Sequence, residues 1–246
     1  MTGPRVITVS GLDVTVLVRP RRRTVGLTVE RDGSITAAVP AGVGDDALAG
    51  VISRKAQWLH GKVRERDELG YQHPPRQFAA GEGFLYLGYS YRLQLVGSGA
   101  PVRLNKTTRR LEMREDCTGD GARHLKAWYR QQGLGFLPQR IAPWAQRMEA
   151  EDHALRVLDL GYHWGSCSPA KRTVNMHWAV MQMNMALIDY VLVHELAHLR
   201  YPRHDDAFWH RVGMFLPLYR EDRKRLRKEG LALWLPEQAS RPGGVG

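Results

Sequence analysis

The fold of this chain is organised around residues 187–209, which read LIDYVLVHELAHLRYPRHDDAFW. His194 and His198 lie four residues apart. On an α-helix this is about 400° of rotation and roughly 6 Å of rise, so the two side chains project from one face. Glu195 follows His194 directly, where its carboxylate can lie beside an open coordination position instead of filling it. The pattern H-E-x-x-H therefore predicts a metal site with a catalytic carboxylate.

The helix that carries this pattern is expected to be buried, because it is apolar on nearly every side. Burying two imidazoles and a carboxylate is costly unless they are paired, hydrogen-bonded or bound to a metal. A hydrogen-bonded pair of core histidines beside a buried Glu195 is the alternative interpretation, and the desolvation cost favours the metal site. The apolar residues are Leu187, Ile188, Tyr190, Val191, Leu192, Val193, Leu196, Ala197 and Leu199.

A third ligand at His204 requires the helix to end before it. On one continuous helix, His204 would lie about 240° from His198 and would face away from the metal. Pro202 predicts a break between them, since proline does not continue a helix and restricts the residue before it. Two alternatives remain. His204 is a surface histidine ahead of a helix capped by Asp205, or the third ligand is a more distant Asp or Glu.

The composition describes a globular chain with excess positive charge. Its 246 residues are 43% hydrophobic, which is enough for a sizeable core. There is no apolar run of membrane-spanning length and no signal-peptide core in the first ten residues, so we expect a cytoplasmic protein with no membrane partner. Cys117 and Cys167 are too few for a disulfide framework. The net charge of +11 suits acidic partners, including nucleic acid or nucleotides, although a solvated basic face is the commoner meaning.

Hydrophobic periodicity predicts an α+β chain with two domains. Apolar residues alternate over residues 5–39 and again over 84–113, which predicts an antiparallel β-rich N-terminal lobe over residues 1–115. Within this lobe a helix over residues 45–70 should cover one face of the sheet. Residues 71–77 read as a linker.

Residues 116–237 are expected to form a mostly helical domain with a short sheet. A strand is predicted near Leu155, a hairpin over residues 161–171 and a returning strand over residues 173–180. Pro138 and Pro143 are expected to kink or divide the first long helix. Residues 238–246 are expected to form a flexible tail.

Motifs elsewhere in the chain accompany the histidine helix. Together they resemble the YgjP-like metallopeptidase family, a group of zincins related to the SprT-type and WLM metallopeptidases. This resemblance implies a zincin-like domain in which His194, His198 and His204 bind Zn²⁺ and Glu195 is the catalytic carboxylate. The residues that carry it are Trp164-Gly165-Ser166-Cys167-Ser168, the run DYVLVHELAHL at residues 189–199, His204, Phe208-Trp209, Gly81-Glu82, Tyr86-Leu87-Gly88 and Ala127-Trp128-Tyr129.

The same resemblance implies where a substrate binds. The strand over residues 173–180 would be the edge strand that pairs with an extended peptide. The expected substrate-binding residues are Trp164, Gly165, Ser166 and His177, and a purely structural hairpin with a core tryptophan is the alternative. The developing oxyanion also needs a donor. Candidate donors are Tyr201, His163, Tyr219 and a backbone N–H of the hairpin.

The sequence thus predicts a zinc metallopeptidase that cleaves peptides or proteins, with Glu195 activating a water on the metal. Two other functions use the same residues. One is a metal-dependent nucleotide pyrophosphatase or phosphohydrolase. The other is a DNA-associated protein whose proteolysis is restricted to DNA-bound proteins, or whose metal site is structural. Basic clusters at residues 19–23, 109–110 and 220–228 motivate both alternatives.

Overall fold

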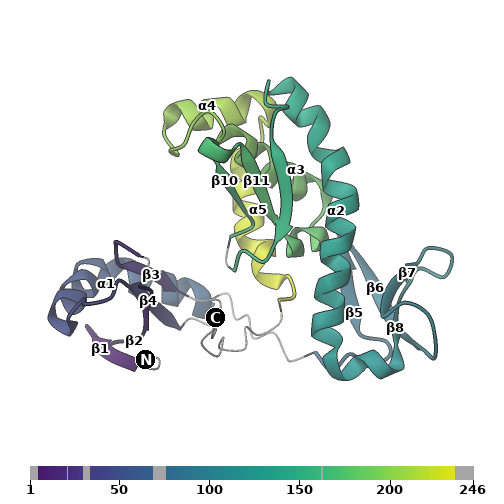
Figure 1. The fold of residues 1–246 in the computed structure, drawn as a ribbon, viewed down its shortest axis with the longest axis horizontal. Coiled ribbons are helices and arrows are strands. Elements are labelled where there is room, and N and C mark those ends of the chain that lie inside the picture. Colours follow the sequence, from purple (N-terminus) through teal and green to yellow (C-terminus); the bar gives the residue numbers. More distant parts are fainter. Residues whose placement is uncertain (1–4, 21, 30–33, 69–75, 162, 236–246) are drawn as a thin grey trace. The chain divides into compact units, whose positions relative to one another are not determined.

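The computed structural model describes residues 5–20, 22–29, 34–68, 76–161 and 163–235 (Figure 1). It divides the chain into two compact units, Met1–His73 and Pro74–Gly246. Helices and short sheets occur together, so the predicted α+β class is confirmed. The expected linker over residues 71–77 and the expected tail over residues 238–246 lie mostly or wholly outside the described residues.

The first unit is one four-stranded sheet covered by one helix. Strands β1 (Arg5–Val9), β2 (Leu12–Val18), β3 (Gly26–Val29) and β4 (Ile35–Val39) lie in the order β1-β2-β4-β3. Helix α1 (Asp45–Glu68) buries an apolar stripe against this sheet, as the sequence predicted. The unit therefore has its own hydrophobic core, which includes Val14, Val16, Ala37, Leu48, Ile52 and Leu59.

The second unit begins with a sheet of the same strand order. Strands β5 (Gly83–Tyr86), β6 (Tyr89–Val96), β7 (Val102–Asn105) and β8 (Arg110–Arg114) are arranged β5-β6-β8-β7. The pairs β2–β4 and β6–β8 are parallel, which corrects the expectation of a wholly antiparallel lobe. Successive strands reverse direction, but the fourth inserts between the second and third. It therefore runs parallel to the second.

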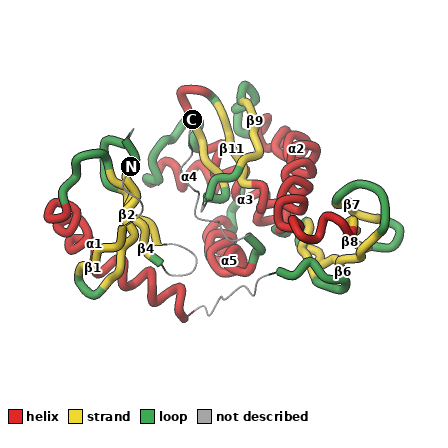
Figure 2. The backbone as a smooth tube through the Cα atoms, turned by 60° about the horizontal axis from the view of Figure 1, so that its bottom comes forward, coloured by secondary structure: helices red, strands yellow, loops and turns green. Residues whose placement is uncertain are grey.

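Helix α2 (Gly121–Arg147) joins this sheet to the rest of the second unit. It follows a short 3₁₀ helix, η1 (Glu115–Asp120), and it runs undivided through Pro138 and Pro143. In Figures 1 and 2 the β5–β8 sheet lies on one side of α2 and the three-stranded sheet on the other. Phe84 and Leu111 share one core with Leu125 and Leu192. The expected domain boundary at residue 115 therefore falls inside a single compact unit.

The three-stranded sheet lies next to the histidine helix. It consists of β9 (Ala154–Leu158), β10 (Gly165–Ser168) and β11 (Thr173–His177), in the order β10-β11-β9. Strand β11 pairs antiparallel with β10 and parallel with β9, so it is the central strand. The expected edge strand over residues 173–180 is thus wrong on two counts. Residues Trp178–Gln182 form the 3₁₀ helix η3, and the edges of this sheet are β10 and β9, of which β10 lies against α3.

Three helices complete the second unit: α3 (Met185–Ala197), α4 (Asp206–Phe215) and α5 (Tyr219–Ala232). Asn184 caps α3, because its side-chain oxygen accepts a hydrogen bond from the Leu187 N–H at 3.2 Å. Asp205 caps α4 in the same way through the Phe208 N–H at 3.0 Å. The cap at Asp205 was predicted from the sequence. Among the described residues, no helix is long and apolar enough to cross a membrane.

Helix α3 is held by α2 through one buried carboxylate. Asp189 is 8% exposed and accepts hydrogen bonds from Arg140 Nε at 2.6 Å and from Trp144 Nε1 at 3.1 Å. A second guanidinium nitrogen of Arg140 reaches the other carboxylate oxygen, so the pair is bidentate. This contact fixes the position and rotation of the helix that carries the first two histidines.

Candidate metal centre

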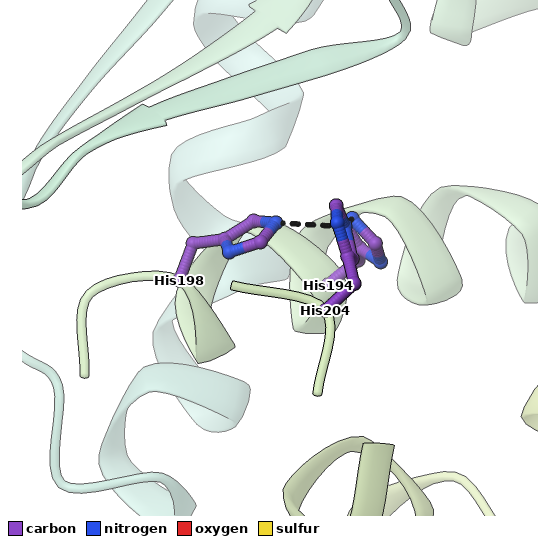
Figure 3. Close-up of side chains that lie close together, drawn as sticks. All are labelled: His194, His198 and His204. Atoms are coloured by element: carbon purple, nitrogen blue, oxygen red, sulfur yellow. Dashed lines mark hydrogen bonds between the residues drawn. The ribbon is translucent and has the colours of Figure 1, made fainter. Parts of the chain in front are cut away.

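Three imidazole rings converge at one point beside the C-terminal end of α3. His194 lies in the last turn of α3, His198 is its C-cap, and His204 comes from the segment before α4. The Nε2 atom of His204 lies 3.0 Å from that of His194 and 3.1 Å from that of His198 (Figure 3). The structure thus brings the three predicted ligand residues together, with one nitrogen from each within 4.8 Å of the others.

The chain turns between His198 and His204 as the sequence predicted. Helix α3 ends at Ala197, and the following turn is closed by a hydrogen bond from the Tyr201 N–H to the Ala197 carbonyl oxygen at 2.9 Å. Pro202 then continues in a non-helical conformation. Because the helix stops, His204 returns to the same face as His194.

The tautomer of His198 is set by its backbone partner. Its Nδ1 lies 2.9 Å from the carbonyl oxygen of Tyr201. A carbonyl oxygen only accepts, so Nδ1 carries the hydrogen and the neutral ring presents a lone pair at Nε2. That lone pair points toward the other two histidines. An orienting hydrogen bond of this kind is typical of a metal-binding imidazole.

Aromatic rings pack around the three imidazoles. Phe208 is fully buried, and its ring centroid lies 4.5 Å from that of His198, 4.9 Å from that of His194 and 4.8 Å from that of His204. Trp209 stacks on His204, with centroids 5.6 Å apart and an interplanar angle of 25°. The first turn of α4 therefore restricts the rotamers of all three histidines, which prearranges their nitrogens.

The nitrogen donors fit a tetrahedral zinc ion. Metal–nitrogen distances of about 2.0–2.1 Å place tetrahedral ligand nitrogens about 3.3–3.4 Å apart, close to the two separations of 3.0 and 3.1 Å that His204 makes with the other histidines. Burial, and next the positive charges of neighbouring groups, lower the pKa of His194 to about 3 and lower the pKa of His204. Both imidazoles are therefore neutral at pH 7, the form that binds a metal.

Glu195 lies beside this cluster and is closely packed by the neighbouring strand. Its side chain is 5% exposed, and burial raises its pKa to about 8. Strand β10 passes directly over it, because a Cβ atom on Gly165 would lie 2.6 Å from both Cγ and Oε1 of Glu195. Only glycine fits at this position without displacing the carboxylate. Gly165, an expected substrate-binding residue, thus also positions Glu195.

A cavity of about 460 Å³ opens over the histidines and Glu195. The expected substrate-binding residues Trp164, Gly165 and Ser166 all line it. His163, a candidate oxyanion donor, lines it as well, whereas the two tyrosines named as donors, Tyr201 and Tyr219, do not. The remaining lining residues are Cys167, Pro169, Tyr190, Val191, His194, Glu195, His198, Pro202, His204 and Leu226.

His177 does not contact the cavity, and this corrects its expected role in substrate binding. The residue is 1% exposed. Its Nδ1 accepts a hydrogen bond from the Ala179 N–H at 3.0 Å, and its Nε2 lies 3.3 Å from Asp159 Oδ1. Its ring also packs edge-on against Trp164. His177 therefore caps η3, and its ring packs against Trp164 at the start of the hairpin.

Tyr190 is a cavity residue that the sequence reasoning missed. It was counted only as an apolar residue of the buried helix, although it precedes His194 by four residues and so lies on the same face. Its ring centroid lies 5.9 Å from that of His194. Burial raises the pKa of its phenol to about 12, so the hydroxyl remains a hydrogen-bond donor at pH 7.

Cys167 also faces the cavity but is not a nucleophile. Burial, and secondly the charge of Glu195, raise the pKa of its thiol to about 11. The reactive form of cysteine is the thiolate, which is scarce at pH 7 under these conditions. Cys167 is thus a partly buried thiol in the cavity wall.

Two comparisons with known proteins gave a match. A family model described as YgjP-like, metallopeptidase domain matches residues 23–229. Among solved structures, the crystal structure of the metallopeptidase zymogen of Pyrococcus abyssi abylysin matches with 23% identity and a TM-score of 0.35, covering 37% of this chain and 92% of that one. No curated protein matches. The family match spans the histidines, Glu195, β10 and most of α5, and the chain belongs to the YgjP-like metallopeptidase family.

Proposed function

We propose that this protein is a zinc metallopeptidase in which His194, His198 and His204 hold the ion and Glu195 is the general base. The observation that carries the proposal is the convergence of three imidazole nitrogens beside a buried carboxylate at the base of one cavity. Three nitrogen ligands leave a fourth position of a tetrahedral zinc ion for water or substrate. That arrangement is typical of catalytic zinc, as opposed to structural zinc.

Glu195 is placed to move the proton during hydrolysis. A zinc ion bound at the histidines would supply a water of lowered pKa and polarise the scissile carbonyl. The Glu195 carboxylate takes a proton from the attacking water and delivers it to the amine that leaves. Burial raises the pKa of the Glu195 carboxyl to about 8, closer to neutral pH than that of an ordinary glutamate, which suits a group that both accepts and releases a proton. Gly165 holds the carboxylate in place during both transfers.

Strand β10 supports binding of an extended peptide. One side of β10 pairs with β11, and the sheets of the described chain contain no strand on its other side. Gly165 and Ser166 line the cavity from this strand. An extended substrate added at this edge would make backbone hydrogen bonds that do not depend on its sequence. Tyr190 and His163 are then the side chains available to donate to the oxyanion.

The cavity lining favours a peptide over a nucleotide. Among the described residues that line it there is no lysine or arginine. Enzymes that transfer phosphoryl groups surround the phosphates with cationic side chains or backbone N–H groups that stabilise the transferred charge. The apolar residues Trp164, Val191 and Leu226 instead suit a polypeptide side chain.

Glu195→Gln tests this function directly. We expect the variant to bind one zinc ion per chain, as the wild type does, and to cleave an unfolded protein substrate about 100- to 10,000-fold more slowly, which is the usual contribution of a positioned general base. Zinc content is measured by elemental analysis and cleavage by mass spectrometry. Glu151→Gln, at an exposed glutamate outside the cavity lining, is the control and should cleave normally. A wild type without zinc, or equal cleavage by both variants, would refute the proposal.

A further inference from the structure

Helix α5 forms one wall of the cavity. Leu226 lines the cavity from this helix. Near its C-terminal end α5 packs against the hairpin, where a Cβ atom on Gly230 would lie 2.9 Å from the Trp164 ring. A substrate held along β10 would therefore place side chains against α5.

Arg223 lies one turn before Leu226 on this wall. Residues three apart on a helix are surface neighbours, so Arg223 lies next to Leu226, just outside the residues that line the cavity. Its guanidinium carbon lies 4.8 Å from the ring centroid of Trp209, and Trp209 in turn stacks on His204. The side chain is exposed. A fixed positive charge thus lies at the rim of the cavity on the side of the third histidine.

The charge of Arg223 has no carboxylate partner among the described residues. The neighbouring Arg225 differs, because it pairs with both Asp222 and Glu229. Glu195, the acidic residue of the cavity lining, is buried beneath β10. Arg223 instead rests on an aromatic face, which holds a guanidinium by a cation–π contact and leaves the N–H groups at its edge available.

We propose that Arg223 is a specificity-determining residue that binds a carboxylate of the substrate. The planar guanidinium matches a carboxylate with two parallel hydrogen bonds. The carboxylate comes either from an aspartate or glutamate side chain or from the free C-terminus of the peptide. This inference rests on the proposed peptidase function, and it adds a substrate preference to it.

Cleavage-site mapping tests the preference. Wild-type protein is incubated with a library of unstructured peptides, each present with a free and with an amidated C-terminus, and the products are sequenced by mass spectrometry. We expect cleavage sites enriched in Asp or Glu at one fixed distance from the broken bond, or cleavage restricted to peptides with a free C-terminus. The first result identifies a side-chain carboxylate and the second a terminal one.

Substitution then assigns the preference to Arg223. For a matched pair of peptides that differ only as Glu and Gln, or as free and amidated ends, we expect the wild type to prefer the carboxylate about 10- to 100-fold in kcat/KM. Arg223→Gln should remove this preference, so that the two peptides of a pair are cleaved equally well. Arg223→Glu should instead prefer a peptide with lysine at the same position over the peptide with glutamate. Lys224→Gln removes an equal charge from an exposed position of the same helix and should leave the ratio unchanged.

A binding measurement separates this inference from the proposed function. In the Glu195→Gln background, fluorescence anisotropy should show the carboxylate peptide binding about 10-fold more tightly than its neutral partner, and Arg223→Gln should remove the difference. Cleavage that depends on Glu195 but shows no carboxylate preference would overturn the role of Arg223 alone. A preference equally reduced by Lys224→Gln would show a general charge effect and would also overturn it. Absence of any Glu195-dependent cleavage would overturn both proposals.

Discussion

The chain contains two modules of the same topology that have different roles. The first module consists of β1–β4 and α1, and the second of β5–β8 and α2. Each opens with a hairpin whose two-residue turn has positive φ at both positions: 53° and 75° at Ser10-Gly11, and 50° and 83° at Leu87-Gly88. Each has a parallel pair formed by its second and fourth strands. The shared order of strands therefore does not itself specify a function.

The difference lies in what each module packs against. The first has a separate core formed by its own sheet and helix. The second shares its core with α3 and α4, and its turn is bonded to η3, since the Leu87 N–H donates to the Met181 carbonyl at 2.8 Å. Its helix α2 also holds Asp189 through Arg140. One topology thus serves as an independent unit in one place and as the support of the metal centre in the other.

Removing zinc should produce the largest difference in lost stability between the two units. A ligand present at about 1,000 times its Kd stabilises the folded state by about 4 kcal/mol, and chelation removes that contribution. We expect the backbone amides of residues 76–235 to exchange faster after this loss, whereas those of residues 5–68 exchange at the same rate as before. The measurement is hydrogen exchange by mass spectrometry with and without a chelator. Equal loss of protection in both units would show that they unfold together and would contradict the comparison.

Breaking one ion pair in each module should give the next largest difference. Arg140→Ala leaves the carboxylate of Asp189 buried without its cation, and we expect a loss of about 3 kcal/mol in the free energy of unfolding. The pair of Arg5 and Asp45 joins β1 to α1 but is exposed on both sides. Arg5→Ala should therefore cost less than about 1 kcal/mol. Urea denaturation measures both, and similar losses would refute the distinction.

The parts of the site predicted from sequence are those encoded by local spacing. The face shared by His194 and His198 follows from helix geometry, and the turn before His204 follows from Pro202. The cap at Asp205 is likewise a local signal. These predictions need only a few consecutive residues, so the sequence contains enough information to make them.

The parts that were missed depend on pairing between distant residues. Strand β11 is central because Thr173 pairs with Ala154, and nothing in either segment specifies that partner. The compact unit that includes residue 115 depends in part on the packing of Phe84 against Trp234, a contact between opposite ends of that unit. His177 was taken for a site residue because it is polar, yet its polar atoms are satisfied in the interior. Residue type and order alone do not reveal these contacts.

The two glycines of the hairpin turns provide the finest test of the comparison, because they occupy equivalent positions. Both have positive φ, so an alanine at either is strained by roughly 1–2 kcal/mol. A Cβ atom at Gly11 would meet nothing within 4 Å, whereas at Gly88 it would lie 2.9 Å from the Cα of Asn184, the cap of α3. We therefore expect Gly88→Ala to cost about 2 kcal/mol more than Gly11→Ala in urea denaturation. Because this overlap displaces the start of the helix that carries His194, Gly88→Ala should also weaken zinc binding while Gly11→Ala leaves it unchanged. Equal costs with equal zinc affinity would show that the second turn, like the first, merely reverses the chain.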